Sequence, residues 1–305
     1  MSDAGPGRFS PLDRSERAKL RTEAPTIGYW SDVWRRFRGN GAGMAGSCIL
    51  LLFVVMAIIG PLLVPYDYET VDLASTYLPP GSEHWFGTDV LGRDIWCRIW
   101  IGARVSLFIG VVSALSQMVI GILIGSISGL SGGKLDMIIM RAVDILIAVP
   151  FLIWVSLFML VLKPGIQSII FAFSFTEWKG MARLVRGEVL RLKETEFVVA
   201  TRGMGASSWR LIRRHLFPNV LPVAIVSVTF QVTSAIFGEA FLSYIGLGIQ
   251  PPLTSWGILI SSGIGEMRTY PYMLFIPAIF ISLTMLSLQL IGDGLRDATD
   301  PKLRQ

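Results

Sequence analysis

Long apolar runs are the feature that most limits what this chain can fold into. Residues 44–64, 107–130, 137–162 and 221–244 contain very few charged side chains. A helix needs about 20 apolar residues to cross roughly 30 Å of hydrocarbon. Over all 305 residues the chain is 52% hydrophobic and 16% charged, whereas about a quarter of a soluble chain is charged. The sequence therefore predicts an all-α membrane protein.

We predict six transmembrane helices, preceded by an N-terminal interfacial helix. The interfacial helix follows from Ile27, Trp30, Trp34 and Phe37, which recur at helical spacing with arginines between them. The alternative is a soluble helix that packs on a partner. Residues 1–43 then form a cytoplasmic tail with this helix, and residues 44–305 form the transmembrane domain. The spans are expected at residues 44–64, 107–130, 137–162, 165–178, 221–244 and 272–291.

Basic residues predict the orientation, because cytoplasmic segments of membrane proteins are enriched in Lys and Arg. They gather before the first span, between the fourth and fifth spans, and after the sixth. Both termini are therefore expected in the cytoplasm of a cell whose plasma membrane the chain crosses several times. The same rule accounts for the net charge of +5, so nucleic acid is not an expected partner. The residues concerned include Arg35, Arg36, Arg38, Lys179, Arg183, Arg186, Arg191, Arg202, Arg210, Arg213, Arg214, Arg296, Lys302 and Arg304.

Two segments outside the spans are longer than a helix–helix connection requires. One is an outer loop at about residues 65–103, in which Arg93 and Arg104 either contact a partner or hold the loop through its aspartates. The other is the cytoplasmic segment 179–219. Within it, residues 197–216 are expected to form two short helices around Gly203 and Gly205, ended by Pro218. Short helices exposed at the membrane surface are suited to docking another protein.

The segment from Val199 to Gly205, followed nine residues later by His215-Leu-Phe-Pro218, resembles the signature loop of ATP-binding-cassette (ABC) importer permeases. Ala200, Gly205 and Pro218 stand in register with the family pattern. Val199, Thr201, His215 and Phe217 depart from it. The resemblance implies that this loop couples the permease to an ATPase subunit; the alternative is a plain surface turn. The coupling residues would be Ala200, Thr201, Arg202, Gly203, Met204, Gly205, Ala206, Trp209 and Arg210.

Further segments across residues 30–305 are similar to the bacterial dipeptide and oligopeptide branch of that family, and the long loop after the first span is typical of its "C" type permease. The resemblance implies a type I importer architecture and the import of short peptides across the inner membrane. It also implies four kinds of partner besides lipid: a homologous second permease, two ATPases that bind ATP and magnesium, an extracytoplasmic binding protein, and the peptide. The matching segments are residues 84–94, 102–107, 239–248, 250–252, 255–257, 292–297 and 300–302.

No ATPase site is expected in this chain. The phosphate-binding pattern Gly-x-x-x-x-Gly-Lys-Ser/Thr does not occur, because Gly133-Lys134 is followed by Leu135. No cofactor or metal site is expected either. The glycine-rich segments 41–46 and 121–129 are interpreted as places where helices approach closely.

Charged residues in the predicted spans, where such residues have a function or a partner, include Arg141, Asp144 and Glu239. Arg141 and Asp144, three apart, form a local ion pair or take part in gating. Glu239 faces the transport path or anchors the neighbouring outer loop. Two other classes of protein are less consistent with the sequence. An intramembrane hydrolase needs a base, and His84 and His215 both lie outside the spans. A secondary transporter predicts internal repeats, which are not seen.

Overall fold

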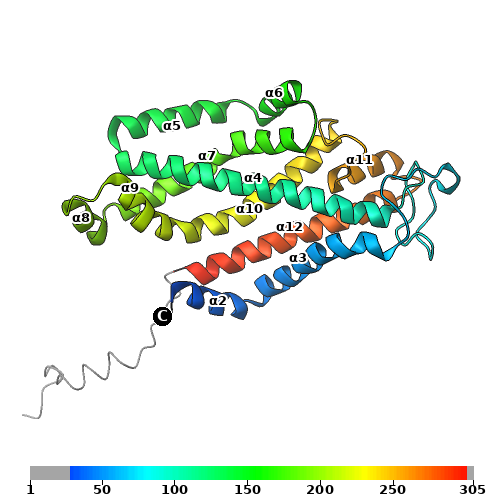
Figure 1. Ribbon diagram of the computed structural model, residues 1–305, viewed down its shortest axis with the longest axis horizontal. Helices are drawn as coiled ribbons and strands as arrows, with labels where there is room; N and C mark the ends of the chain where they lie inside the picture. Colours follow the sequence, from blue (N-terminus) through cyan, green and yellow to red (C-terminus); the bar gives the residue numbers. More distant parts are fainter. Residues whose placement is uncertain (1–27, 301–305) are drawn as a thin grey trace, which may run out of the picture.

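The computed structural model describes residues 28–300, in which helices account for all regular structure apart from one isolated bridge between Thr88 and Asp94. The predicted cytoplasmic tail and the last basic residues, Lys302 and Arg304, lie outside the described residues. Figure 1 shows long helices running side by side, with α8 at one end and a long loop at the other. The helices are α2 (Tyr29–Gly39), α3 (Gly41–Ile59), α4 (Ile95–Ser131), α5 (Gly133–Ala148), α6 (Phe151–Leu162), α7 (Ile166–Leu192), α8 (Glu196–Gly203), α9 (Ser208–Leu211), α10 (Phe217–Tyr244), α11 (Trp256–Glu266) and α12 (Tyr272–Thr299), with short turns η1 (Gly60–Leu63), η2 (Leu73–Ser75) and η3 (Ile212–Leu216).

Four helical segments are long and apolar enough to cross a membrane: Gly41–Leu63, Ile95–Ser131, Ser208–Tyr244 and Tyr272–Thr299. The predicted third span is broken, because α5 and α6 meet at an angle of 83° around Pro150; counted as one span, they make a fifth. Proline lacks the N–H that would continue the helix. The predicted fourth span lies in α7, which is not among the helices of sufficient hydropathy. The all-helical class is confirmed, and the count of six spans stays a prediction.

Helix α7 continues 14 residues beyond the predicted end of the fourth span, to Leu192. The interpretation of residues 179–192 as a loop was therefore wrong. Lys179, Arg183 and Arg186 recur at helical spacing and face α5. Lys179 Nζ donates to the Leu146 carbonyl at 3.0 Å, Arg183 pairs with Asp144, and Arg186 pairs with Asp136. The cations thus hold two helices together instead of marking an exposed connection.

Glycines on α4 bring it into close contact with α7, as the spacing of Gly121, Gly125 and Gly129 predicts. A Cβ added at Gly125 would lie 2.5 Å from the Ala182 carbonyl oxygen, which is closer than real Cβ contacts allow. The partner helix belongs to this chain. Glycines of α3 act similarly at α12, where a Cβ at Gly46 would lie 2.6 Å from the Ser287 oxygen.

Helix α2 packs on α12 through Val33 and Phe37, while Trp30 and Trp34 are 49% and 57% exposed. The expected amphipathic helix therefore forms, beginning at Tyr29, and its position in a membrane interface stays a prediction. Helix α4 begins at Ile95, so the irregular connection covers residues 64–94 and is shorter than the predicted 65–103. We call residues 64–94 the long loop. Helix α11 was not predicted at all.

Candidate functional site: an exposed corner and three polar sites

The segment between α7 and α10 turns sharply at Gly205. The Gly205 N–H donates to the Arg202 carbonyl at 3.0 Å, and the Ala206 N–H donates to the Thr201 carbonyl at 3.3 Å. These two bonds form a Schellman motif, which requires a left-handed residue where Gly205 has φ +82°. The expected turn between two short helices is therefore present, and Gly205 is its left-handed residue. Ser207 then caps α9, because its Oγ accepts from the Arg210 N–H at 3.3 Å.

One face of this segment holds it to the bundle and the other is exposed. We call residues 196–211 the α8–α9 corner. Val198 and Leu211 are each 1% exposed and pack in the same cluster as Val185 and Val189 of α7. Met204 and Trp209, in contrast, are 80% and 63% exposed. Ala200 is exposed too, and a Cβ at Gly205 would meet no atom within 4 Å. The corner is therefore a rigid turn that presents apolar side chains outward.

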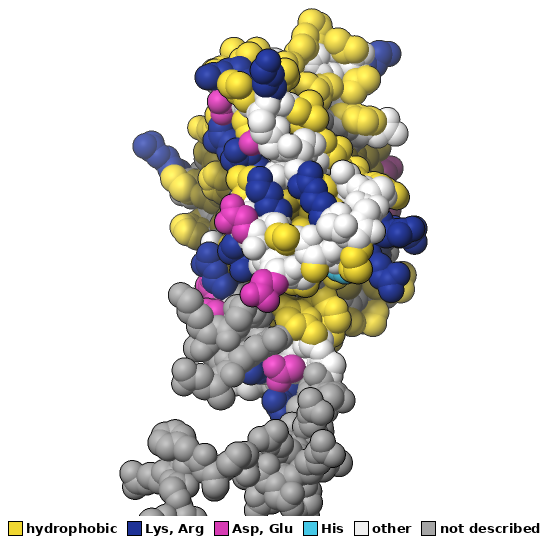
Figure 2. Space-filling view, turned by 90° about the vertical axis from the view of Figure 1, so that its left-hand side faces the viewer, with side chains coloured by type: hydrophobic (Ala, Val, Ile, Leu, Met, Phe, Trp, Pro, Cys, Tyr) yellow, Lys and Arg dark blue, Asp and Glu magenta, His cyan; other side chains and the backbone are white. Residues whose placement is uncertain are grey.

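Arginines surround those apolar side chains. Trp209, Arg210, Arg213 and Arg214 line a cavity of about 390 Å³, and Arg202 is exposed nearby in the sequence. Figure 2, which views this end of the molecule, shows Lys and Arg side chains gathered around apolar and uncharged surface. An exposed apolar centre with a basic rim is suited to a partner surface that has an acidic edge. Arg213 and Arg214 belong to this surface although they are not among the predicted coupling residues; their helical spacing from Arg210 was the available signal.

The prediction that Pro218 ends the second short helix was wrong. Residues 208–244 are one helix, which passes Pro218 through the π-helical turn η3. In this turn the Phe217 N–H bonds to the Ile212 carbonyl, and Asn219 Nδ2 donates to the His215 carbonyl at 2.7 Å. The wider turn and the side-chain donor accommodate the proline, so the corner is continuous with the span that carries Glu239.

Glu239 is fully buried in a cage of serine hydroxyls. Ser243 and Ser255 donate to Oε1 at 2.8 and 2.7 Å, and Ser106 donates to Oε2 at 3.3 Å. Ser255 is also the N-cap of α11. The carboxylate thus joins α4, α10 and α11. These contacts match the interpretation in which Glu239 anchors the neighbouring connection.

Arg141 and Asp144 do not form the expected local ion pair. Asp144 Oδ1 lies 2.5 Å from Arg183 Nη2 of α7 instead, and both side chains are 49% exposed. Among the described residues Arg141 makes no ion pair within 4.0 Å. An ion pair between α5 and α7 therefore replaces the local contact predicted from spacing alone. A gating role for either residue stays a prediction.

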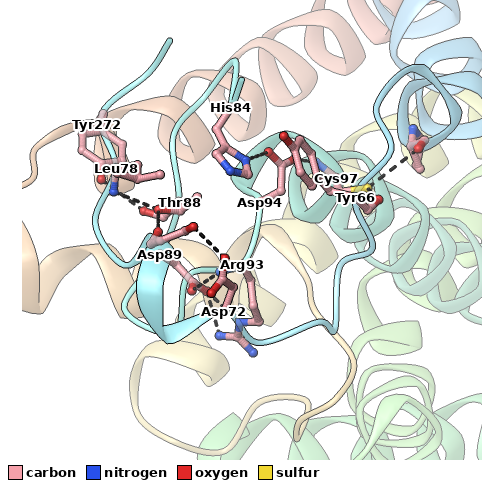
Figure 3. Close-up of polar contacts among 12 residues, drawn as sticks. Tyr66, Asp72, Leu78, His84, Thr88, Asp89, Arg93, Asp94, Cys97 and Tyr272 are labelled. Carbon is pink, nitrogen blue, oxygen red and sulfur yellow. Dashed lines mark hydrogen bonds and ion pairs between the residues drawn. The ribbon is translucent and has the colours of Figure 1, made fainter. Parts of the chain in front are cut away.

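Buried charges organise the long loop (Figure 3). Asp89 accepts from Arg93 Nε at 2.8 Å, and Arg98 Nε lies 3.6 Å from it. Asp94 caps α4 through the Cys97 N–H and contacts His84 Nδ1 at 2.8 Å. Arg93 therefore holds the loop, one of the two expected alternatives. Arg104 lies on α4 and donates to the carbonyls of Ala57 and Ile58.

Acid–base shifts in the loop have local causes. The Ser75 hydroxyl and the Ala74 N–H, which both donate to Asp72, hold the pKa of this carboxyl below its usual value. Tyr272 ties the loop to α12, because its hydroxyl donates to the Thr88 carbonyl at 3.1 Å. The loop is thus held both by polar contacts within itself and by a hydrogen bond from α12.

An all-helical bundle with helices of membrane-spanning length is typical of integral membrane proteins. Solved structures agree on the fold. A chain of the inward-facing MetNI methionine ABC transporter aligns with TM-score 0.52 and 20% identity over 66% of this chain and 97% of its own. Residues 121–305 match the family described as binding-protein-dependent transport system inner membrane component, and residues 28–80 match the N-terminal TM domain of oligopeptide transport permease C.

Curated relatives place the chain more narrowly. The oligopeptide transport system permease protein OppC of Bacillus subtilis (strain 168) is 46% identical over 100% of both chains. The dipeptide transport system permease protein DppC of the same organism is 47% identical over 92% of this chain and 88% of its own. OppC of Escherichia coli (strain K12) is 42% identical over 94% and 95%. The chain belongs to the binding-protein-dependent transport permeases, in the branch of OppC and DppC. It is a multi-pass inner membrane permease of an ABC importer and not the ATPase.

Proposed function

We propose that this chain is one of two permease subunits of an importer of short peptides. The second permease is a homologue, and the transport path runs between the two. Two ATPase subunits bind ATP and magnesium, and an extracytoplasmic binding protein delivers the peptide. Both termini lie in the cytoplasm. The relatives named for oligopeptide and dipeptide transport support the substrate class.

The observation that carries this proposal is the α8–α9 corner. Its buried residues Val198 and Leu211 leave it little freedom to move relative to the bundle, while Met204 and Trp209 are available to a partner. Exposed Trp with neighbouring Arg is the composition of energetically dominant interface residues. We assign the corner to an ATPase subunit, whose groove receives Met204 and Trp209 and whose acidic edge meets Arg202 and Arg210. Ala200 and Gly205 permit close approach.

The continuous helix 208–244 supplies the coupling. Movement of the ATPases displaces the corner, and because no break separates the corner from α10, the displacement reaches the core of the permease. Alternating access then follows as a rigid-body movement of helices. The basic residues around the corner support its cytoplasmic position, and with it the orientation of the termini.

The deciding experiment introduces a negative charge into the proposed contact between the α8–α9 corner and the ATPase. Ala200→Glu should remove the ATPases from the purified complex and abolish peptide uptake, while insertion and pairing with the second permease persist, because the side chain is exposed. Gly205→Arg should also release the ATPases, although an arginine at φ +82° strains the turn as well. Ala74→Glu is the matched control: Ala74 is also exposed but lies in the long loop, so this variant should retain both ATPases. An Ala200→Glu complex with bound ATPases and full uptake would contradict the docking assignment.

A further inference from the structure

A cavity of about 490 Å³ lies between α4, α7 and α10, next to the start of α6. This volume is within the range of small-ligand sites, roughly 300–1,000 Å³. Its walls are mainly apolar and aromatic, with Phe173 and Phe237 among them. Three polar side chains with chemistry suited to binding also line it, namely Gln117 on α4, Glu177 on α7 and Gln231 on α10. None of the sequence patterns singled out these three residues.

The two amides have unused hydrogen-bonding capacity. Gln117 is 2% exposed and makes no hydrogen bond to the rest of residues 28–300. The Oε1 of Gln231 is buried and also lacks a partner there, while its Nε2 donates weakly to Ser227 Oγ at 3.5 Å. A buried acceptor is normally satisfied, so Gln231 Oε1 calls for a donor in the cavity. The N–H and C=O groups of a peptide backbone complement both.

Glu177 supplies a negative charge in the same cavity. Its carboxylate is exposed there and has no cation within 4.0 Å in the described part of the chain. Lys179, two residues on, is 9% exposed and donates to the Leu146 carbonyl of α5. Glu177 lies one residue before Trp178, the predicted end of the fourth span. A carboxylate that lines a cavity and has no cation beside it is available to a cationic group of a ligand.

We propose that this cavity is a peptide-binding site within the transport path of this subunit. Glu177 binds the ammonium group at the peptide's amino terminus, Gln117 and Gln231 bind its backbone, and the phenylalanines contact its side chains. An anionic solute would be repelled by Glu177, and a purely apolar occupant would leave both amides unpaired. The substrate class rests on the proposed function; the site itself is tested separately below.

Filling the cavity tests whether it is on the path. Gly180 lines the cavity, is exposed, and has no atom within 4 Å of an added Cβ, so the backbone has room for a side chain there, and Gly180→Trp is designed to fill the cavity with an indole. Uptake of trialanine should fall at least about tenfold while the ATPases stay bound. Gly187→Trp, two turns along the same helix and equally open, should transport normally. Normal uptake by Gly180→Trp would overturn the proposal.

Thiol protection tests what the cavity binds. In the whole complex, embedded in lipid nanodiscs without nucleotide or binding protein, Ser234→Cys is labelled with a maleimide in a Cys48→Ser background; Cys97 is buried. Trialanine should slow the labelling, and N-acetyl-trialanine should need about tenfold higher concentration, because a charge-assisted bond is lost. Glu177→Gln should remove this difference and Glu177→Asp should restore part of it. Ser262→Cys on α11, outside the cavity, should show no protection.

Three results of the labelling experiment would overturn the proposal. The first is equal protection by the two peptides with Glu177 intact, and the second is no protection by either peptide. The third is a Ser234→Cys thiol that never reacts, which would mean that a helix of the second permease or lipid fills the cavity. Uptake by the wild-type complex, measured with ATP and binding protein, is a separate readout. If protection follows the expected pattern and uptake of trialanine is absent, the proposed function fails and the binding site stands.

Discussion

Two glutamates of this chain lie in similar sequence segments but have very different environments in the structure. Glu239 and Glu177 both lie within long helices, yet Glu239 is fully buried among Ser106, Ser243 and Ser255 while Glu177 is exposed in a cavity. A carboxylate whose oxygens accept three hydroxyl bonds fixes the neighbouring helices. One without a partner is free to bind something else. The same substitution is therefore predicted to destabilise the protein at Glu239 and to have little effect on stability at Glu177.

Glu239→Ala should destabilise the permease by about 2–4 kcal/mol, since it leaves three serine hydroxyls without their acceptor and opens a void beside α11. Glu177→Ala, in which no contact is lost, should change stability by less than about 0.5 kcal/mol. Unfolding of the purified complex by heat or denaturant measures both. Equal stability of the two variants would show that the serine cage contributes nothing.

At the scale of elements, the contact between α4 and α7 depends on the absence of side chains on α4. Gly125 lies against the Ala182 carbonyl and the Val185 side chain, so no larger residue fits without separating the helices. Gly187, on α7 itself, faces open space. Gly125 must therefore be glycine for steric reasons, whereas the space around Gly187 would admit a larger side chain.

Gly125→Leu should cost about 1–3 kcal/mol or more through overpacking. Gly187→Leu should have the opposite sign and stabilise α7 by roughly 0.5–1 kcal/mol, because leucine favours a helix over glycine. The free energy of unfolding of each variant, compared with that of the wild type in the same assay, tests both expectations. A neutral Gly125→Leu would mean that α4 and α7 separate without loss, contrary to the observed packing.

The sequence could predict the long apolar helices, because soluble proteins rarely contain apolar segments of this length. It could also predict the glycine contacts between helices. They could not locate the end of α7, because Lys179, Arg183 and Arg186 resemble a cytoplasmic loop until α5 supplies their partners. Glu177 was missed for the same reason, since its neighbour Lys179 marked the expected end of the span. At the corner, the turn at Gly205 was predictable from its glycine, whereas passage through Pro218 depends on η3 and Asn219.

For the whole molecule, the two ends differ in chemistry, which predicts their sides of the membrane. The end with α8 carries the arginines around the corner, while in the long loop buried aspartates pair with the arginine and histidine. An externally active reporter should work after Asp72 and Ser262 and fail after Lys193 and Gln305. Activity after Lys193 together with silence after Asp72 would reverse the orientation, and the corner would then face away from any cytoplasmic ATPase.

Because residues Ser208 to Tyr244 form one continuous helix, the number of residues between the corner and Glu239 fixes how the two are oriented relative to each other. A helix has angular phase as well as length: each residue turns the chain by 100°, following 3.6 residues per turn. One residue added between Trp209 and Glu239 would leave every side chain's chemistry intact and yet rotate the face that bears Trp209 by about 100° relative to the serine cage. A substitution in this segment changes one side chain and its neighbours. An inserted residue, in contrast, rotates one end of the helix relative to the other.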